Sequence, residues 1–96
     1  MDNLPYIIAN VPPAARMEQL AEEAAELAQA ALKMARIMRG DNPTPVPYME
    51  ALRRLREEYT DVFVSAVAAE LLTDSDLAKA KMDRWAARVK ERMGEE

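Results

Sequence analysis

The chain has 96 residues, a length that fits one domain or one subunit of an assembly and leaves no room for a second domain. Its formal net charge of −4 gives no overall attraction to nucleic acid or to anionic membranes, so neither is an expected partner. The absence of Cys and His excludes disulfides, thiolate nucleophiles and imidazole bases. Any chemistry must therefore use carboxylates, lysine, arginine and hydroxyl groups.

Half of the residues are hydrophobic and only two are Gly, which is typical of a helical protein, and we expect an all-α fold. Residues 1–11 form an apolar N-terminal arm, followed by the sequence NVPPAA. Asn10 is a candidate helix cap and Pro13 suits a first helical position, so a long helix is expected from there. Its apolar residues recur at alternating steps of three and four, and Gly40 is its expected end.

Residues 40–47 contain three prolines and are expected to form a connector, in which Thr44 is a candidate cap for the next helix. This second long helix is expected from about Tyr48 to Leu72. Its last part, SAVAAELL, is apolar nearly all round and is expected to be central. The sequence TDSD, residues 73–76, then supplies caps for a third helix. The apolar stripe of that helix consists of Ala78, Met82, Trp85, Val89 and Met93.

Two long helices and a third make up most of an up-down helical bundle. Three amphipathic helices in so short a chain leave apolar faces to cover, so the bundle is completed either within the chain or by a second copy. We expect self-association to complete it. The N-terminus is acidic where a signal peptide is basic, and no segment resembles a membrane span, so the expected compartment is the cytoplasm.

Each long helix carries a pair of carboxylates three residues apart, Glu23 with Glu26 and Glu58 with Asp61. Each pair lies along one face of its helix, and Glu26 and Asp61 are each the sole charge in an otherwise uncharged stretch. Four carboxylates on facing helices can bind a hard cation such as Mg²⁺, which prefers oxygen ligands. The same pairs could instead be solvated flanks or form salt bridges between subunits.

Six of the 13 Lys and Arg residues fall on the third helix. Lys81, Arg84 and Arg88 share a flank beside the Trp85 stripe and could bind phosphates. Such a flank could also be solvated or pair with the acids of a neighbour. Lys33 is a further cation, on the first long helix, with no role assigned by its surroundings.

In this order, the sequences EEAAEL, EEYTDV and KMDRWAAR resemble the MazG-like all-α nucleoside triphosphate pyrophosphohydrolases, over roughly residues 16–88. The resemblance implies hydrolysis of a (d)NTP to the (d)NMP and pyrophosphate, with Mg²⁺ or Mn²⁺, in a homodimer or tetramer. It assigns the substrate phosphates to Lys81, Arg84 and Arg88. The family motif, EExxE followed by ExxD, places the catalytic metal ligands at Glu23, Glu26, Glu58 and Asp61.

A different class of function remains open, a non-catalytic module of the same fold that oligomerises or binds a partner. A third class, nucleic-acid binding through the third helix, is disfavoured by the acidic balance of the chain.

Overall fold

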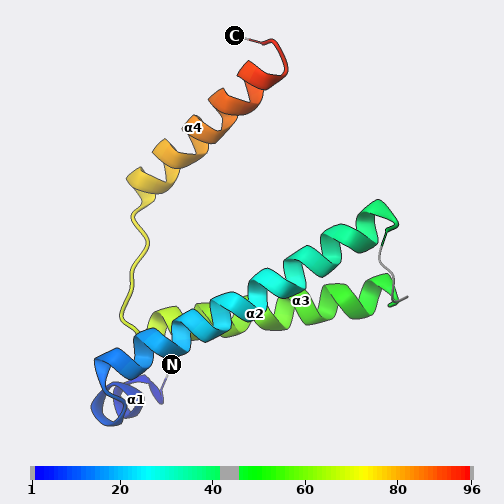
Figure 1. The fold of residues 1–96 in the computed structure, drawn as a ribbon. Helices are drawn as coiled ribbons and strands as arrows, with labels where there is room; N and C mark the ends of the chain where they lie inside the picture. The colour runs from blue at the N-terminus through cyan, green and yellow to red at the C-terminus, as the bar shows by residue number, and fades with distance from the viewer. Residues whose placement is uncertain (1, 42–45, 96) are drawn as a thin grey trace.

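The computed structural model describes residues 2–41 and 46–95, and every regular element in them is a helix. The four helices are α1 (Leu4–Asn10), α2 (Pro13–Arg39), α3 (Tyr48–Ala68) and α4 (Ser75–Arg92). The all-α prediction is therefore confirmed for this part of the chain. Helices α2 and α3 pack along each other as a hairpin, while α4 extends away from it (Figure 1). No helix in the described ranges has the length and apolarity needed to cross a bilayer.

Part of the N-terminal arm is itself a helix, α1, which the sequence did not predict. Pro5 lies in its first turn, where a proline costs no hydrogen bond and presets the helical φ angle. The side-chain amide of Asn10 donates a hydrogen bond to the carbonyl oxygen of Tyr6 at 2.8 Å. Asn10 thus closes α1, and its predicted role as the cap of α2 is wrong, because Pro12 occupies that position.

The ends of α2 match the prediction. The helix begins at Pro13 and stops before Gly40, whose φ of 76° is the left-handed conformation that glycine adopts without strain. The Gly40 N–H donates to the carbonyl oxygen of Ile37, and the Asp41 N–H donates to that of Arg36, both at 3.1 Å. Thr44, the candidate cap of α3, lies outside the described residues.

Helix α3 ends at Ala68, four residues earlier than predicted. The N–H of Glu70 donates to the carbonyl oxygen of Val67, and the N–H of Leu71 to that of Ala66, both at 3.0 Å. This pattern terminates a helix with one left-handed residue, here Glu70 with a φ of 59°. The chain that follows is exposed, and Leu72 is 94% exposed, so this final part is not central in the chain.

Arg16 holds the ends of three helices together. Its guanidinium donates to the carbonyl oxygen of Val11 at 3.0 Å and to that of Ala68 at 2.7 Å. It also pairs with the Glu70 carboxylate at 3.4 Å, and the Arg16 side chain is buried. The α1–α2 corner is thereby attached to the end of α3 by charge-assisted hydrogen bonds.

The apolar core is thin. Met34, Ala51 and Ala69 are the buried hydrophobic residues of the described chain, and none of its large side chains is fully buried. The radius of gyration is 17.5 Å, whereas a compact chain of this length has about 12.5 Å. All described residues of α4 are exposed, including its predicted apolar stripe. The packed part of the described chain is thus the α2–α3 hairpin with α1 at its end, and α4 adds no buried residue to it.

Candidate metal centre

The α2–α3 hairpin brings three of the four predicted carboxylates together. Glu23 and Glu26 come from α2, and Glu58 comes from the facing side of α3. Each offers one carboxylate oxygen, and these oxygens all lie within 4.8 Å of one another. Side chains three residues apart share one helical face, which is why Glu23 and Glu26 both reach the same place on α3.

Glu58 occupies a core position of its helix. The buried residues of α3 are Ala51, Glu58 and Ser65, which recur at steps of seven and therefore form one stripe that faces α2. Glu58 is only 8% exposed, whereas Glu23 is half-buried and Glu26 is exposed. The helix pairing therefore places a carboxylate where an apolar side chain would ordinarily pack.

Two oxygens of this cluster have no protein partner. Glu23 Oε2 and Glu58 Oε2 are both buried and make no hydrogen bond within the described residues. Nearly all buried polar atoms in proteins are hydrogen-bonded, so these two oxygens call for a partner such as a water molecule or an ion. Carboxylate oxygens are also the ligands that Mg²⁺ prefers. The donor set and its unpartnered oxygens fit a hard divalent cation.

The electrostatics of the cluster point the same way. Burial raises the pKa of Glu58 above its ordinary value, and the nearby charge of Glu26 raises this pKa further. The Arg54 guanidinium opposes this shift, and Asp61 adds a smaller increase. A carboxylate crowded by other carboxylates binds cations more strongly, because a cation relieves the repulsion.

Asp61 lies outside the group of three. It is on α3, one turn beyond Glu58, and its residue is exposed. Its carboxylate is not among the three whose oxygens lie within 4.8 Å of one another. Its charge still acts on Glu58, but its role as a metal ligand remains a prediction.

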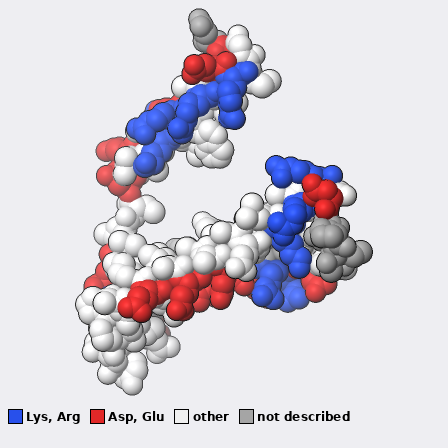
Figure 2. All heavy atoms as spheres, viewed as in Figure 1, with Lys and Arg blue, Asp and Glu red and all other residues white. Residues whose placement is uncertain are grey.

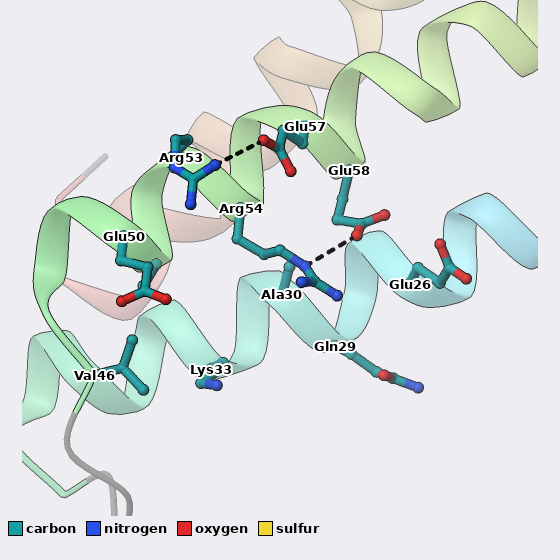
Figure 3. A pocket seen from close by; sticks show the side chains of 11 residues that line it. Glu26, Gln29, Ala30, Lys33, Val46, Glu50, Arg53, Arg54, Glu57 and Glu58 are labelled. Carbon is teal, nitrogen blue, oxygen red and sulfur yellow. Dashed lines mark hydrogen bonds and ion pairs between the residues drawn. The ribbon is translucent and has the colours of Figure 1, made fainter.

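A pocket of about 530 Å³ adjoins the carboxylates on the side of the connector, between α2 and α3 (Figure 3). Arg54 Nε lies 3.3 Å from Glu58 Oε1, and Arg53 Nη1 lies 3.2 Å from Glu57 Oε1. The pocket is lined by Glu26, Gln29, Ala30, Lys33, Val46, Glu50, Ala51, Arg53, Arg54, Glu57 and Glu58.

The cations of this pocket differ from the predicted phosphate ligands. Lys33, Arg53 and Arg54 line it, and the sequence had given Lys33 no role and had not indicated the two arginines. The available signal was that each arginine stands four residues before a glutamate, the spacing of a helical ion pair.

The predicted phosphate ligands lie on a separate helix. These residues, Lys81, Arg84 and Arg88, belong to the basic side chains gathered along α4 (Figure 2), and none of the three lines the pocket. All three are exposed, and their binding of phosphate remains a prediction.

Three carboxylates beside three cations can bind a divalent cation together with an anion, because each charge is matched by one of opposite sign. A phosphate group that chelates a metal is such an anion.

Comparisons of the chain with protein-family models, with curated proteins and with solved structures find no match.

Proposed function

We propose that this chain is a Mg²⁺-dependent nucleoside triphosphate pyrophosphohydrolase, which hydrolyses a (d)NTP to the (d)NMP and pyrophosphate. The observation that supports this proposal is the buried carboxylate of Glu58, whose Oε2 has no partner and which lies beside Glu23 and Glu26. These are three of the four positions that the resemblance to the MazG-like family assigns to metal ligands. The reaction needs neither His nor Cys, which suits the composition of the chain.

The residues of the hairpin would divide the work between them. Glu23, Glu26 and Glu58 would hold Mg²⁺ or Mn²⁺, and Asp61, which is exposed on α3, is the expected fourth ligand. The bound ion would polarise a phosphoryl oxygen and lower the pKa of a water molecule. A carboxylate of the cluster would accept the proton of the attacking water. Cationic side chains would stabilise the charge that develops on the phosphates.

The test is pyrophosphate release from a panel of canonical and modified nucleoside triphosphates, with and without Mg²⁺. Glu58→Gln keeps the shape of the side chain and removes its charge. We expect this variant to lose pyrophosphate release by about a hundredfold or more, because a metal ligand and its charge are lost together. Glu18→Gln is the matched control, since Glu18 is an exposed glutamate of α2 outside the cluster. Equal rates in the two variants would contradict the proposal.

A second candidate is a non-catalytic helical module that oligomerises or binds a partner. The observation in its favour is the exposed apolar stripe of α4, in which Trp85 is 59% exposed. This candidate predicts a folded protein that releases no pyrophosphate across the panel. It also predicts that added Mg²⁺ leaves the melting temperature unchanged and that Asp61→Ala does not lower it.

A further inference from the structure

The ion pair between Arg54 and Glu58 is unequal in its exposure. The Glu58 side chain is only 10% exposed and is fixed between the helices, whereas the Arg54 side chain is 72% exposed. Figure 3 shows Arg54 reaching from α3 toward α2, with its guanidinium beside Glu58. Arg54 is therefore the partner with room to move, and Glu58 is the one that stays. A cation bound by Glu58 would compensate its buried charge in place of Arg54.

The same pocket holds two more cations. Lys33 comes from α2, and Arg53 is paired with Glu57, whose carboxylate is exposed, unlike that of Glu58. Within the described residues Lys33 forms no ion pair. Lys33 stands seven residues after Glu26, which is about 10 Å along the helix. The cations thus extend from the carboxylate cluster toward the connector, on both walls of the pocket.

We propose that Lys33, Arg53 and Arg54 form a phosphate subsite, which binds the polyphosphate of a metal-chelated di- or triphosphate. Arg54 pairs with Glu58 until such an anion enters, and then turns from the carboxylate to the phosphate oxygens. The identity of the substrate rests on the proposed function, but these residues are distinct from the carboxylates that carry it. They are also distinct from the basic residues of α4.

The chemistry of the guanidinium supports this exchange. Arginine presents a planar fork of N–H donors that matches two phosphate oxygens, and such bidentate bonds are stronger than a single-contact pair with a carboxylate. The contact in the structure, from Arg54 Nε to Glu58 Oε1, is a single one at 3.3 Å. Once Glu58 serves as a metal ligand, its negative charge is shared with the ion, which weakens its hold on Arg54. Metal and phosphate therefore bind better together than separately.

Calorimetric titration tests the subsite with two probes, Mg²⁺ alone and inorganic pyrophosphate at a fixed Mg²⁺ concentration. In Arg54→Gln we expect Mg²⁺ affinity equal to that of the wild type or a few-fold higher, because Glu58 loses a competing cation. We expect the affinity for pyrophosphate to fall about tenfold or more, since a charge-assisted hydrogen bond is lost. Lys33→Gln should weaken pyrophosphate binding and leave Mg²⁺ affinity unchanged.

Arg56→Gln is the matched control. Arg56 is an exposed arginine of the same helix that lines no part of the pocket, so the variant loses the same charge without touching the site. Pyrophosphate affinity in Arg54→Gln equal to that in Arg56→Gln would overturn the subsite. An equal loss of Mg²⁺ and pyrophosphate affinity would also overturn it, because Arg54 would then act only by holding Glu58 in place. Melting curves establish that each variant is folded.

The failure of this inference is distinguishable from failure of the proposed function. If the wild type hydrolyses no nucleotide but Arg54→Gln responds differently to the two probes, the subsite is supported and the proposed function is overturned. If the wild type releases pyrophosphate but Arg54→Gln keeps both its pyrophosphate affinity and its KM, the proposed function is supported and the subsite is overturned. A wild-type protein that binds neither probe overturns both.

Discussion

Glu58 faces α2 from a position where an apolar side chain would normally pack. The other buried residues of its stripe, Ala51 and Ser65, are small. Burying a charged group is unfavourable unless a partner compensates it, and one oxygen of Glu58 has no such partner in the described residues. The buried charge of Glu58 therefore lowers the stability of the hairpin.

The buried charge of Glu58 predicts that the stability of the protein depends on pH in the presence of EDTA. Because the pKa of Glu58 is raised in the folded state, that state holds the proton more tightly than the unfolded chain does. The contribution of this proton is complete below the ordinary carboxyl pKa and is lost as the pH rises through the raised pKa. Thermal melts of the wild type should therefore show a decline across that window. Glu58→Gln should remove this decline and Glu18→Gln should keep it; parallel curves for the two variants would contradict the prediction.

For single residues, the sequence predicts a position where the spacing along the chain is compatible with only one structural arrangement. The helical period places Glu23 and Glu26 on one face of α2, and the resemblance to the EExxE and ExxD motif joins that face to Glu58. The exposure of Asp61 could not be predicted, because it depends on which part of α3 faces α2. Arg54 was missed because a cation four residues before an acid is common on any helix surface.

The helix ends differ in how clearly their residues mark them. Gly40 ends α2 with a left-handed conformation, and glycine is the residue that adopts it most readily. Glu70 adopts the same conformation after α3 although it has a Cβ atom, and its carboxylate pairs with Arg16. Nothing in the type of residue marks Glu70 as a helix end, which is why the predicted helix ran on to Leu72.

The backbone conformation of Glu70 predicts the relative stability of two variants. Glu70→Gly and Glu70→Ala both remove the carboxylate that pairs with Arg16, so they differ in the cost of a left-handed Cβ-bearing residue. We expect Glu70→Gly to be more stable than Glu70→Ala by about 1 kcal/mol, as measured by urea unfolding. Equal midpoints would show that this helix end is not strained.

The molecule as a whole leaves apolar surface uncovered. Positive side chains gather along α4, while the hairpin shows a row of acidic side chains over one part and positive side chains toward the connector (Figure 2). Phe63 on α3 and Trp85 on α4 are each more than half exposed. Large apolar side chains in such number at the surface of a small protein mark surfaces that bind other chains.

These surfaces predict self-association. We expect sedimentation velocity at micromolar concentration to give two or four times the chain mass of 10.8 kDa. Trp85→Ser should shift the distribution toward the monomer, because it removes the largest side chain of the α4 stripe. Tyr6→Ser, which removes an exposed aromatic residue of α1, serves as the control. A monomer at all concentrations would contradict the prediction and leave the apolar stripe of α4 to a different partner.

The helical class and the order of the three long helices followed from composition and hydrophobic period, which are local properties of the chain. The placement of α4 did not, because an amphipathic stripe such as that around Trp85 requires a partner without specifying which one. Residues 71–74, which lead to α4, are not helical and are exposed, so they form no packed corner that would set the angle between the helices.

Trp85 is the single tryptophan of the chain, and it stands on α4, which extends away from the hairpin that carries the carboxylates (Figure 1). All indole fluorescence therefore comes from α4, and its emission moves to shorter wavelength when water is excluded from the ring. The fluorescence of Trp85 therefore reports whether another surface covers α4. Titrations followed at this wavelength separate two events that activity alone would merge, the binding of ions within the hairpin and the docking of its distant helix.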